Sequence, residues 1–258
     1  MNKTKSFFRQ YRYEFIAFIV NVISASLSIL LTTPQLAFVI AVIVFTLSMF
    51  VVIYFRTKDR DFYFLPLDKP GSDGDWVGRG TFKFIKNEMC YEITGSSVGF
   101  IYPKIALWDD YILECDFRII KTSLGVIFRA QNLSNCVMIQ LFNDRIKSHL
   151  RVNGEWIVYG DDKTSTNLGV DSWYKLKAYC EKRKIRINIF SGENELLDRH
   201  ITIPDTIAVV VKQEPNESKE IKDEIKQIIN VDFDFGSIGF RNFGNESALI
   251  KSVFIEKL

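Results

Sequence analysis

Two long apolar runs lie back to back near the start of the chain, Phe15–Leu31 and Leu36–Phe55. Neither run contains a charged side chain, and Asn21 is their one amide side chain. At about 1.5 Å per residue, a helix of this length crosses about 25–30 Å of hydrocarbon. A soluble domain rarely opens on two such helices, so the pattern predicts a transmembrane hairpin over residues 13–55.

Basic residues flank this hairpin on both sides. Because Lys and Arg in short flanks stay on the cytoplasmic side, we expect a cytoplasmic basic tail over 1–12 and a cytoplasmic linker over 56–74. The protein would then be a multi-pass protein of the inner membrane, with both its N-terminus and its C-terminal domain in the cytoplasm. The alternative is a cleaved signal peptide before one anchor, but the first run is long and no small-residue cleavage site follows it. The flanking residues are Lys3, Lys5, Arg9 and Arg12 on one side and Arg56, Lys58 and Arg60 on the other.

Small and polar side chains form a stripe on the first span, and small ones recur on the second. Such residues let helices approach closely in lipid. One interpretation is that the two spans pack on each other. The other is that Asn21 and the serines also hydrogen-bond between protomers and make a homo-oligomer within the lipid bilayer. The stripe comprises Asn21, Ser24 and Ser28, with Ala37 and Ala41 on the second span.

The remainder of the chain has the pattern of short strands separated by turn-forming residues. This pattern predicts an antiparallel β-sandwich over 75–258. Tyr111–Ile120 alternates apolar and polar residues with a period of two, as a half-buried strand does. Asn153-Gly154 predicts a tight hairpin turn. Further loops are expected at Gly95–Ser97, Trp108–Asp110, Asn132–Asn135, Gly160–Asp162 and Ser191–Asn194.

One segment, 205–230, breaks this rhythm. Isoleucines recur there at helical spacing with charges between them, which predicts a loop and a short amphipathic helix inserted between strands. The helix either packs on the sandwich or docks a protein partner or the membrane surface. The isoleucines are Ile221, Ile225, Ile228 and Ile229.

The order of the strand motifs resembles that of the concanavalin A-like lectin/glucanase jelly roll, including its laminin-G-like and keto-disaccharide hydrolase-like branches. This resemblance implies two curved antiparallel sheets, with ligands on the concave face or on the rim loops. The motifs are Trp108–Arg118, Gly125–Ala130, Met138–Leu141, Trp173–Ala178, Gly236–Arg241 and Val253–Glu256.

The resemblance does not bring a full catalytic set. Arg129 and Gln140 match the hydrolase-like branch, but Met138 stands where that branch carries an acidic residue. Glu114 and Asp116 match part of the glucanase pattern, and they are weak candidates for a pair of catalytic acids. Arg118 continues their row, which favours a solvated ladder of ion pairs. We therefore expect no enzymatic activity.

Metal and nucleotide cofactors are not expected either. The cysteines are scattered, without the clustered donors that zinc needs, and Cys115 has the pattern of a buried free thiol. No βαβ rhythm or G-x-G-x-x-G is present, which excludes a doubly wound nucleotide fold.

Basic residues favour a binding surface. Three segments place them on one strand face each, and together these would present a basic sheet surface suited to phosphate or carboxylate groups. The alternative is the ordinary polar outer face of an antiparallel sheet. The ligand-binding candidates are Arg118, Arg129, Gln140, Arg145, Lys147, His149, Arg151, Lys175, Lys177, Lys184 and Arg186.

Three functions fit these patterns. The first is a membrane-tethered, non-enzymatic sensing module that binds a glycan or a small anionic ligand. The second is a membrane-disrupting effector of a bacterial anti-phage nucleotide-signalling system, which would oligomerise through its two-span hairpin. The third is a glycoside hydrolase or lyase that uses Glu114 and Asp116.

Overall fold

The computed structural model describes residues 42–47, 61–211 and 225–258. The chain divides into two compact units, Met1–Phe64 and Leu65–Leu258. In the first unit, residues 42–47 are helical and expose Val42, Ile43, Phe45 and Leu47. The rest of the predicted hairpin lies outside the described residues, as do Asn21, Ser24, Ser28, Ala37 and Ala41. Within the described ranges, no helix has the length and apolar character needed to cross a membrane.

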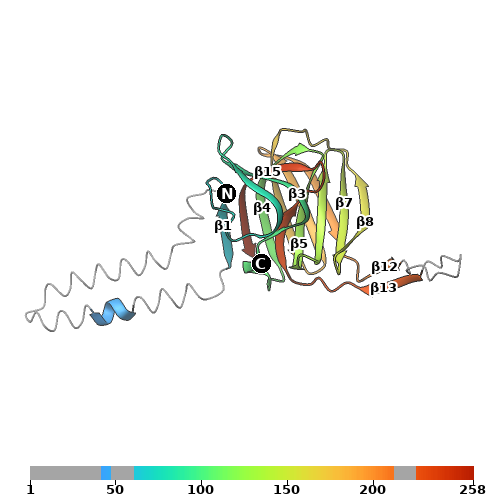
Figure 1. The fold of residues 1–258 in the computed structure, drawn as a ribbon, viewed down its shortest axis with the longest axis horizontal. Coiled ribbons are helices and arrows are strands. Elements are labelled where there is room, and N and C mark those ends of the chain that lie inside the picture. The colour runs from blue at the N-terminus through green and yellow to red at the C-terminus, as the bar shows by residue number, and fades with distance from the viewer. Residues whose placement is uncertain (1–41, 48–60, 212–224) are drawn as a thin grey trace, which may run out of the picture. The chain divides into compact units, whose positions relative to one another are not determined.

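The predicted all-β architecture is confirmed in the described residues (Figure 1). A single turn of 3₁₀ helix, η1 (Pro103–Ile105), interrupts the strands. The strands are β1 (Phe62–Pro66), β2 (Val77–Ile85), β3 (Cys90–Ile101), β4 (Tyr111–Lys121), β5 (Ser123–Asn132), β6 (Asn135–Phe142), β7 (Arg145–Val152), β8 (Glu155–Lys163), β9 (Trp173–Glu181), β10 (Lys184–Ser191), β11 (Asn194–Thr202), β12 (Thr206–Val211), β13 (Ile225–Asn230), β14 (Ser237–Arg241) and β15 (Ser247–Lys257).

The two layers of the sandwich are joined by β3. The hydrogen-bonded order is β11-β10-β9-β4-β15-β3-β14-β5-β6-β7-β8, and the sheet folds over at β3 (Figure 1). The first part of β3 pairs with β15 through Tyr91–Thr94, and its last part pairs with β14 through Phe100 and Ile101. Gly95 and Gly99 lie between these parts with φ of 61° and 96°. Glycine adopts such angles readily, so the strand bends without ending.

Two predicted loops are therefore wrong. Gly95–Ser97 lies inside β3, because its glycine bends a continuing strand. Gly160–Asp162 lies inside β8, where Gly160 pairs with Ser148, Asp161 with Lys147 and Asp162 with Ile146. At Gly160–Asp162, pairing with β7 overrides the local turn preference.

The alternation predicted for residues 111–120 is confirmed in β4. Leu113, Cys115, Phe117 and Ile119 are buried, while the residues between them are partly exposed. The thiols of Cys90, Cys115, Cys136 and Cys180 are all free and buried. Burial raises the pKa of Cys136 to about 12, so this thiol behaves as a small apolar side chain.

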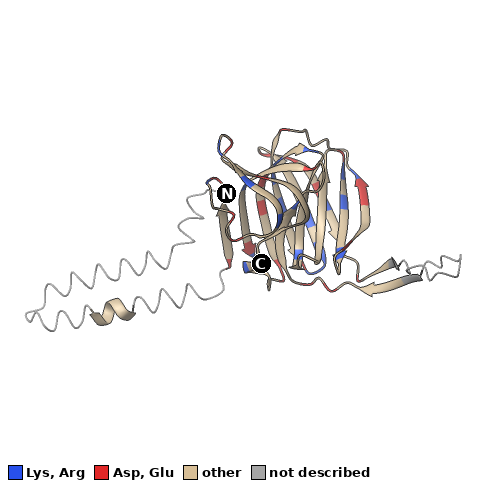
Figure 2. Ribbon diagram, viewed as in Figure 1, with Lys and Arg blue, Asp and Glu red and all other residues tan. Residues whose placement is uncertain are grey.

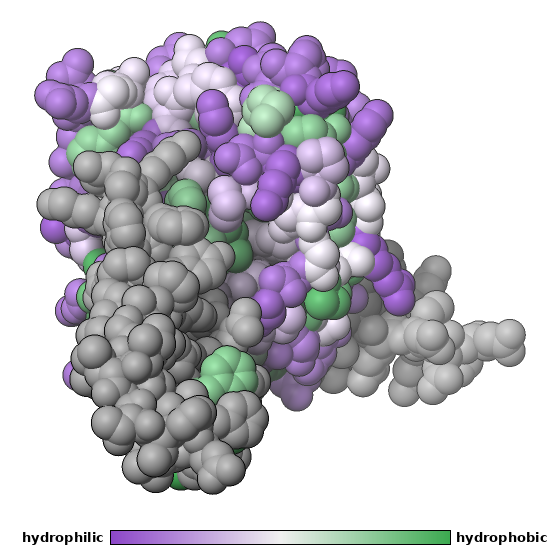
Figure 3. Space-filling model, turned by 90° about the vertical axis from the view of Figure 1, so that its left-hand side faces the viewer, coloured by the Kyte–Doolittle hydropathy of each residue, from purple (hydrophilic) through white to green (hydrophobic). Residues whose placement is uncertain are grey.

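The outer surface is mixed and polar, as expected of a folded domain. Figure 2 shows basic and acidic residues interleaved along the strands. On the face shown in Figure 3, hydrophilic residues predominate outside the grey atoms, and apolar residues are scattered among them.

The hairpin turn predicted at Asn153-Gly154 is confirmed between β7 and β8. Both residues have positive φ, 51° and 92°, as a type I′ turn requires. The turn sets the pairing of Arg151 with Trp156 across the two strands.

The helix predicted within 205–230 is wrong for its described part. Residues 206–211 and 225–230 form β12 and β13, which pair antiparallel with each other in a sheet of their own. Ile and Val are β-branched and favour strands, so pairing between these segments overrides the helical spacing. Ile228 is 71% exposed. Residues 212–224 lie outside the described part, and a protein partner at this insertion remains a prediction.

We expect Gly239→Ala to destabilise the fold by about 3 kcal/mol, because a methyl group at this position would overlap backbone atoms. Gly239 pairs with Ile101 of β3 and Ile127 of β5, and its added Cβ would collide with the carbonyl oxygen of Phe100. Denaturant unfolding followed by tryptophan fluorescence measures the loss.

The matched control for this change is Gly74→Ala. A Cβ at Gly74 would meet its nearest atom at an ordinary 3.6 Å. We expect the control to change stability by less than about 0.5 kcal/mol. Equal stability of the two variants would contradict the close approach of β14 to β3.

Candidate functional site

The outer face of β5–β8 carries a small apolar cluster separate from the sandwich core. Along β6, Val137 and Ile139 alternate with Met138 and Gln140, so the latter two point to the opposite face. Leu133 and Trp156 pack over this cluster. Its buried members are Ile101, Ile127, Ala130, Cys136 and Met138. We call the surface over it the Trp156 face, comprising Met138, Gln140, Lys147, His149, Arg151, Trp156 and Arg241.

Two guanidinium groups lie against the Trp156 ring. The guanidinium carbon of Arg241 is 4.7 Å from the ring centroid, and that of Arg151 is 5.1 Å away. Such cation–π contacts hold the cations in place on the ring. Within the part of the chain that the structure describes, neither guanidinium forms an ion pair with a carboxylate. No carboxylate among the described residues is therefore in direct contact with either guanidinium.

Arg241 is partly buried, and among the described residues its guanidinium hydrogen-bonds only to uncharged groups. Its Nε donates to the carbonyl oxygen of Ser97 at 3.0 Å, and Nη1 lies 4.0 Å from the sulfur of Met138. Burial lowers the pKa of Arg241. The negative charge of Glu246 raises this pKa, and the positive charge of Arg151 lowers it further. A guanidinium under these conditions gains stability from an incoming anion.

Arg151 fixes the turns beside the Trp156 face. Its Nε donates to the carbonyl oxygen of Gly154 at 2.9 Å, and its Nη1 donates to that of Leu133 at 2.6 Å. These bonds tie the β7–β8 turn to the β5–β6 turn. The Arg151 charge is thus held in one position rather than on a free surface chain.

Gln140 organises the loop before β15. Its Nε2 donates to Ser123 Oγ at 3.0 Å and to Glu246 Oε1 at 2.6 Å. The other Glu246 oxygen accepts the backbone N–H of Phe243 at 2.7 Å. Both oxygens of this carboxylate are therefore engaged by neutral donors, which hold the Glu246 side chain in place.

His149 sits edge-on to Trp156, with ring centroids 6.2 Å apart. Burial, followed by the charges of Arg241 and Lys147, lowers its pKa to about 4, and Asp161 opposes the shift. Its Nε2 is buried and has no hydrogen-bond partner among the described residues. The imidazole is consequently neutral near pH 7.

The other basic residues of β7 are paired with acids. Lys147 lies 3.4 Å from Asp161 on β8, and Arg145 lies 3.2 Å from its neighbour Asp144. The structure thus brings the predicted residues Gln140, Lys147, His149 and Arg151 together near Trp156, and it adds Arg241.

The prediction of one basic surface over three strands is wrong. β7 lies between β6 and β8, whereas β9 and β10 lie next to each other in the other half of the sheet. In that half, Arg186 pairs with Tyr179, and Lys177 pairs with Asn188. The residues Lys175, Lys177, Lys184 and Arg186 therefore share one face, but it is not that of Arg145–Arg151.

Acidic partners offset much of the charge on the β4–β9–β10 face. Glu114 lies 3.2 Å from Lys177, and Asp116 accepts a hydrogen bond from Ser252 Oγ at 2.7 Å. Arg118 pairs with Glu88 at 2.9 Å and stacks over Trp173, while Arg186 pairs with Asp198 at 2.7 Å. Glu114 and Asp116 stand in a ladder of polar pairs, on a different layer from the Trp156 face.

Arg129 is an interior residue and not part of a binding surface. It is fully buried, and its guanidinium donates to the carbonyl oxygens of Asp234 and Lys182, each at 2.7 Å. It also contacts Asp110 at 3.3 Å and lies over the Tyr111 ring. The expectation that Arg129 binds ligand is wrong, because all of these partners belong to the framework.

Metal-ligand residues do not gather anywhere in the described ranges. Across 42–47, 61–211 and 225–258, no group of three or more His, Cys, Asp or Glu side chains is arranged to hold an ion.

Comparison with known proteins finds only distant similarity to solved structures. No protein-family model matches the sequence, and no curated protein sequence matches it. Similar solved structures include the carbohydrate binding module CBM66 from Bacillus subtilis, with 18% identity and a TM-score of 0.45 over 71% of this chain and 96% of that one. A Bacillus subtilis protein of unknown function with a galectin-like fold has 13% identity and a TM-score of 0.49 over 78% of this chain and 97% of that one.

A third similar structure is larger than this chain. It is the GH43 protein BlXynB from Bacillus licheniformis, with 13% identity and a TM-score of 0.46 over 78% of this chain and only 40% of that one. Likeness at these levels does not extend to a ligand or an activity.

We expect acid to destabilise the protein through His149. The folded-state pKa of about 4 lies below the ordinary value of 6.5, so the unfolded chain takes up the proton first as the pH falls. Stability is then lost between about pH 6.5 and pH 4, and no further loss comes from this group below that window. In His149→Gln the fall in melting temperature between pH 7 and pH 4.5 should be smaller by roughly 3 °C.

The matched control is His200→Gln, which changes the chain's other histidine. His200 is exposed on β11, with 73% of its side chain accessible. We expect this variant to keep the pH profile of the unchanged protein. A His149→Gln profile parallel to that of the unchanged protein would contradict the neutral, buried imidazole.

Proposed function

We propose that the sandwich binds a small anionic ligand on the Trp156 face without turning it over, and that a sugar bearing a carboxylate is the best-fitting class. The observation that carries this proposal is the pair Arg241 and Arg151 on Trp156, with no ion-pair partner among the described residues. A guanidinium offers a planar fork of donors that matches a carboxylate.

The surroundings of the two arginines suit a sugar acid. Partial burial of Arg241 strengthens its attraction for an anion, because less water screens the charge. The imidazole of His149 is neutral, so it adds no charge that would oppose or compete for the anion beside Trp156. Phe243, whose ring lies 5.4 Å from the Arg241 guanidinium, adds an exposed apolar surface.

The placement of the acids supports binding without hydrolysis. Glycoside hydrolysis needs two carboxyl groups flanking the scissile bond. Near the Trp156 face, Glu246 is engaged by Gln140 and Phe243, and Asp161 is paired with Lys147. Glu114 and Asp116 belong to the other layer.

Membrane tethering is the second part of the proposal. The two apolar N-terminal runs would anchor the chain, with the basic flanks keeping the sandwich on the cytoplasmic side. Self-association through the stripe of Asn21, Ser24 and Ser28 belongs to the same proposal.

We expect Arg241→Met to weaken binding of D-glucuronate about 10- to 100-fold, because it removes a charge-assisted contact. Arg241→Lys keeps the charge and should lose less. D-Glucose, which lacks the carboxylate, should bind more weakly than D-glucuronate to the unchanged protein. Isothermal titration of the full chain in mild detergent measures all three.

Arg186→Met is the matched control for this series. It removes an exposed arginine on the other layer, and we expect it to leave D-glucuronate binding unchanged. Equal binding of D-glucose and D-glucuronate, or full binding by Arg241→Met, would refute the anion site.

The tether can be tested by protease treatment of bacterial spheroplasts that express the full chain. We expect the C-terminal domain to stay intact until the inner membrane is permeabilised, because the positive flanks retain it inside. A tagged periplasmic-side protein serves as the control for protease activity. Digestion of the domain in intact spheroplasts would show that the orientation is reversed.

A further inference from the structure

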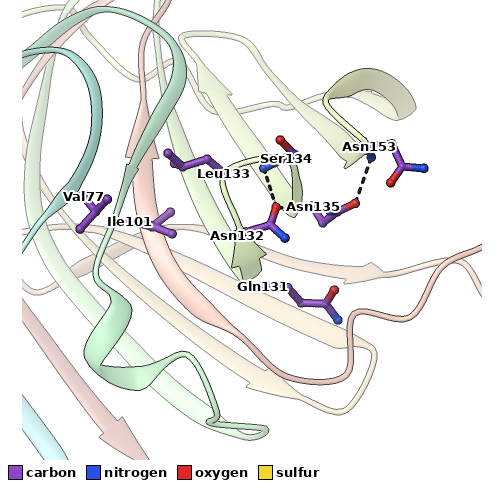
Figure 4. Close-up of a pocket in the computed structure, with 8 residues that line it drawn as sticks. All are labelled: Val77, Ile101, Gln131, Asn132, Leu133, Ser134, Asn135 and Asn153. Atoms are coloured by element: carbon purple, nitrogen blue, oxygen red, sulfur yellow. Dashed lines mark hydrogen bonds between the residues drawn. The ribbon is translucent and has the colours of Figure 1, made fainter.

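A hollow of about 740 Å³ adjoins the Trp156 face (Figure 4). It is formed by the β5–β6 turn together with Asn153 of the β7–β8 turn, and Val77 and Ile101 contribute to its lining. The hollow is wide open to solvent, and its volume exceeds what one bound anion needs.

The residues that line the hollow are uncharged, and they form an apolar group and a polar group. Figure 4 shows Val77, Ile101 and Leu133 on one side, facing a group of polar side chains on the other. The polar group consists of amides and a hydroxyl, and none of the lining residues is ionisable. Amides opposite an apolar wall suit a sugar ring, which carries hydroxyl groups on its edge and C–H groups on its faces.

The polar side of the hollow is held in place by its own hydrogen bonds. Asn132 Oδ1 accepts the backbone N–H of Ser134 at 2.8 Å and the side-chain amide of Asn135 at 3.3 Å. Asn135 Oδ1 accepts the backbone N–H of Asn153 at 3.0 Å.

These bonds leave several polar groups available. Among the described residues, no hydrogen bond engages the Asn132 Nδ2, the Ser134 hydroxyl or the Asn153 side-chain amide. A fixed frame with spare donors and acceptors loses little entropy when a ligand binds.

The hollow and the Trp156 face are physically continuous. Arg151 donates to the Leu133 carbonyl oxygen in the wall of the hollow, and its guanidinium lies over the Trp156 ring. Leu133 and Trp156 also pack against the same apolar cluster. One ligand can therefore contact both surfaces.

We infer that the hollow receives an uncharged sugar unit joined to the acidic unit at Arg241, so that the ligand is an acidic oligosaccharide of two or more units. This inference rests on the proposed anion site. It adds that the number of sugar units in the ligand, and not the ligand's charge alone, determines how tightly the protein binds it.

The experiment compares uronate- and sialate-terminated saccharides of one, two and three units with their uncharged counterparts, printed on an array and then titrated in solution. The probes are applied to the full chain and to Ser134→Ala/Asn153→Gly. This double variant removes the two spare polar groups, and glycine tolerates the φ of 51° at position 153. The Asn153 N–H that Asn135 accepts is retained.

In the unchanged protein, we expect acidic saccharides of two or three units to bind about tenfold tighter than the acidic single unit. The double variant should lose this gain and keep its affinity for the single unit. Lys182→Gly serves as the control, because it truncates a side chain at another turn residue with positive φ, 50°, on the other layer. We expect this variant to bind the longer acidic saccharides as tightly as the unchanged protein does.

The outcomes separate the two proposals. If the acidic single unit binds as tightly as the longer saccharides, or if the double variant keeps the gain, the inference about the hollow is wrong while the anion site stands. If uncharged saccharides bind as tightly as acidic ones, the anion site fails and the inference falls with it.

Discussion

The fold depends on a cation buried between the two layers. Arg129 in β5 is fully buried, and its guanidinium joins the segment before β14, through Asp234, to the β9–β10 turn, through Lys182. Its own backbone N–H donates to the Tyr111 hydroxyl of β4 at 3.1 Å. A buried charge is tolerated only with such partners, so the three elements must meet at this point for the chain to fold.

This constraint places β14 where the candidate site needs it. β14 runs between β3 and β5, and Arg241 at its end pairs with Gly125. A side chain at Gly125 would come within 2.6 Å of the Arg241 carbonyl oxygen, so the close approach requires glycine there. Arg241 thereby contacts the ring of Trp156 on β8, although three strands, β5, β6 and β7, lie between β14 and β8 in the sheet.

Local patterns predicted local structure well. The alternation of β4 and the Asn153-Gly154 turn depend on neighbouring residues, and both were correct. The grouping of basic strands failed, because strand order depends on long-range pairing that spacing does not reveal. Arg241 was missed for the same reason: it lies far along the chain from Trp156, and only the fold brings them together. The 225–230 segment shows that β-branched residues at helical spacing still pair as a strand.

The shared strand β3 has a consequence for how the domain comes apart. Because one strand carries backbone hydrogen bonds to both halves of the sheet, neither half has an independent edge there from which to separate. Loss of β3 removes support from β14 and β15 together. Amide hydrogens of the two halves should accordingly exchange with solvent through one common opening event, so that the surface around Trp156 persists only as long as the distant layer does.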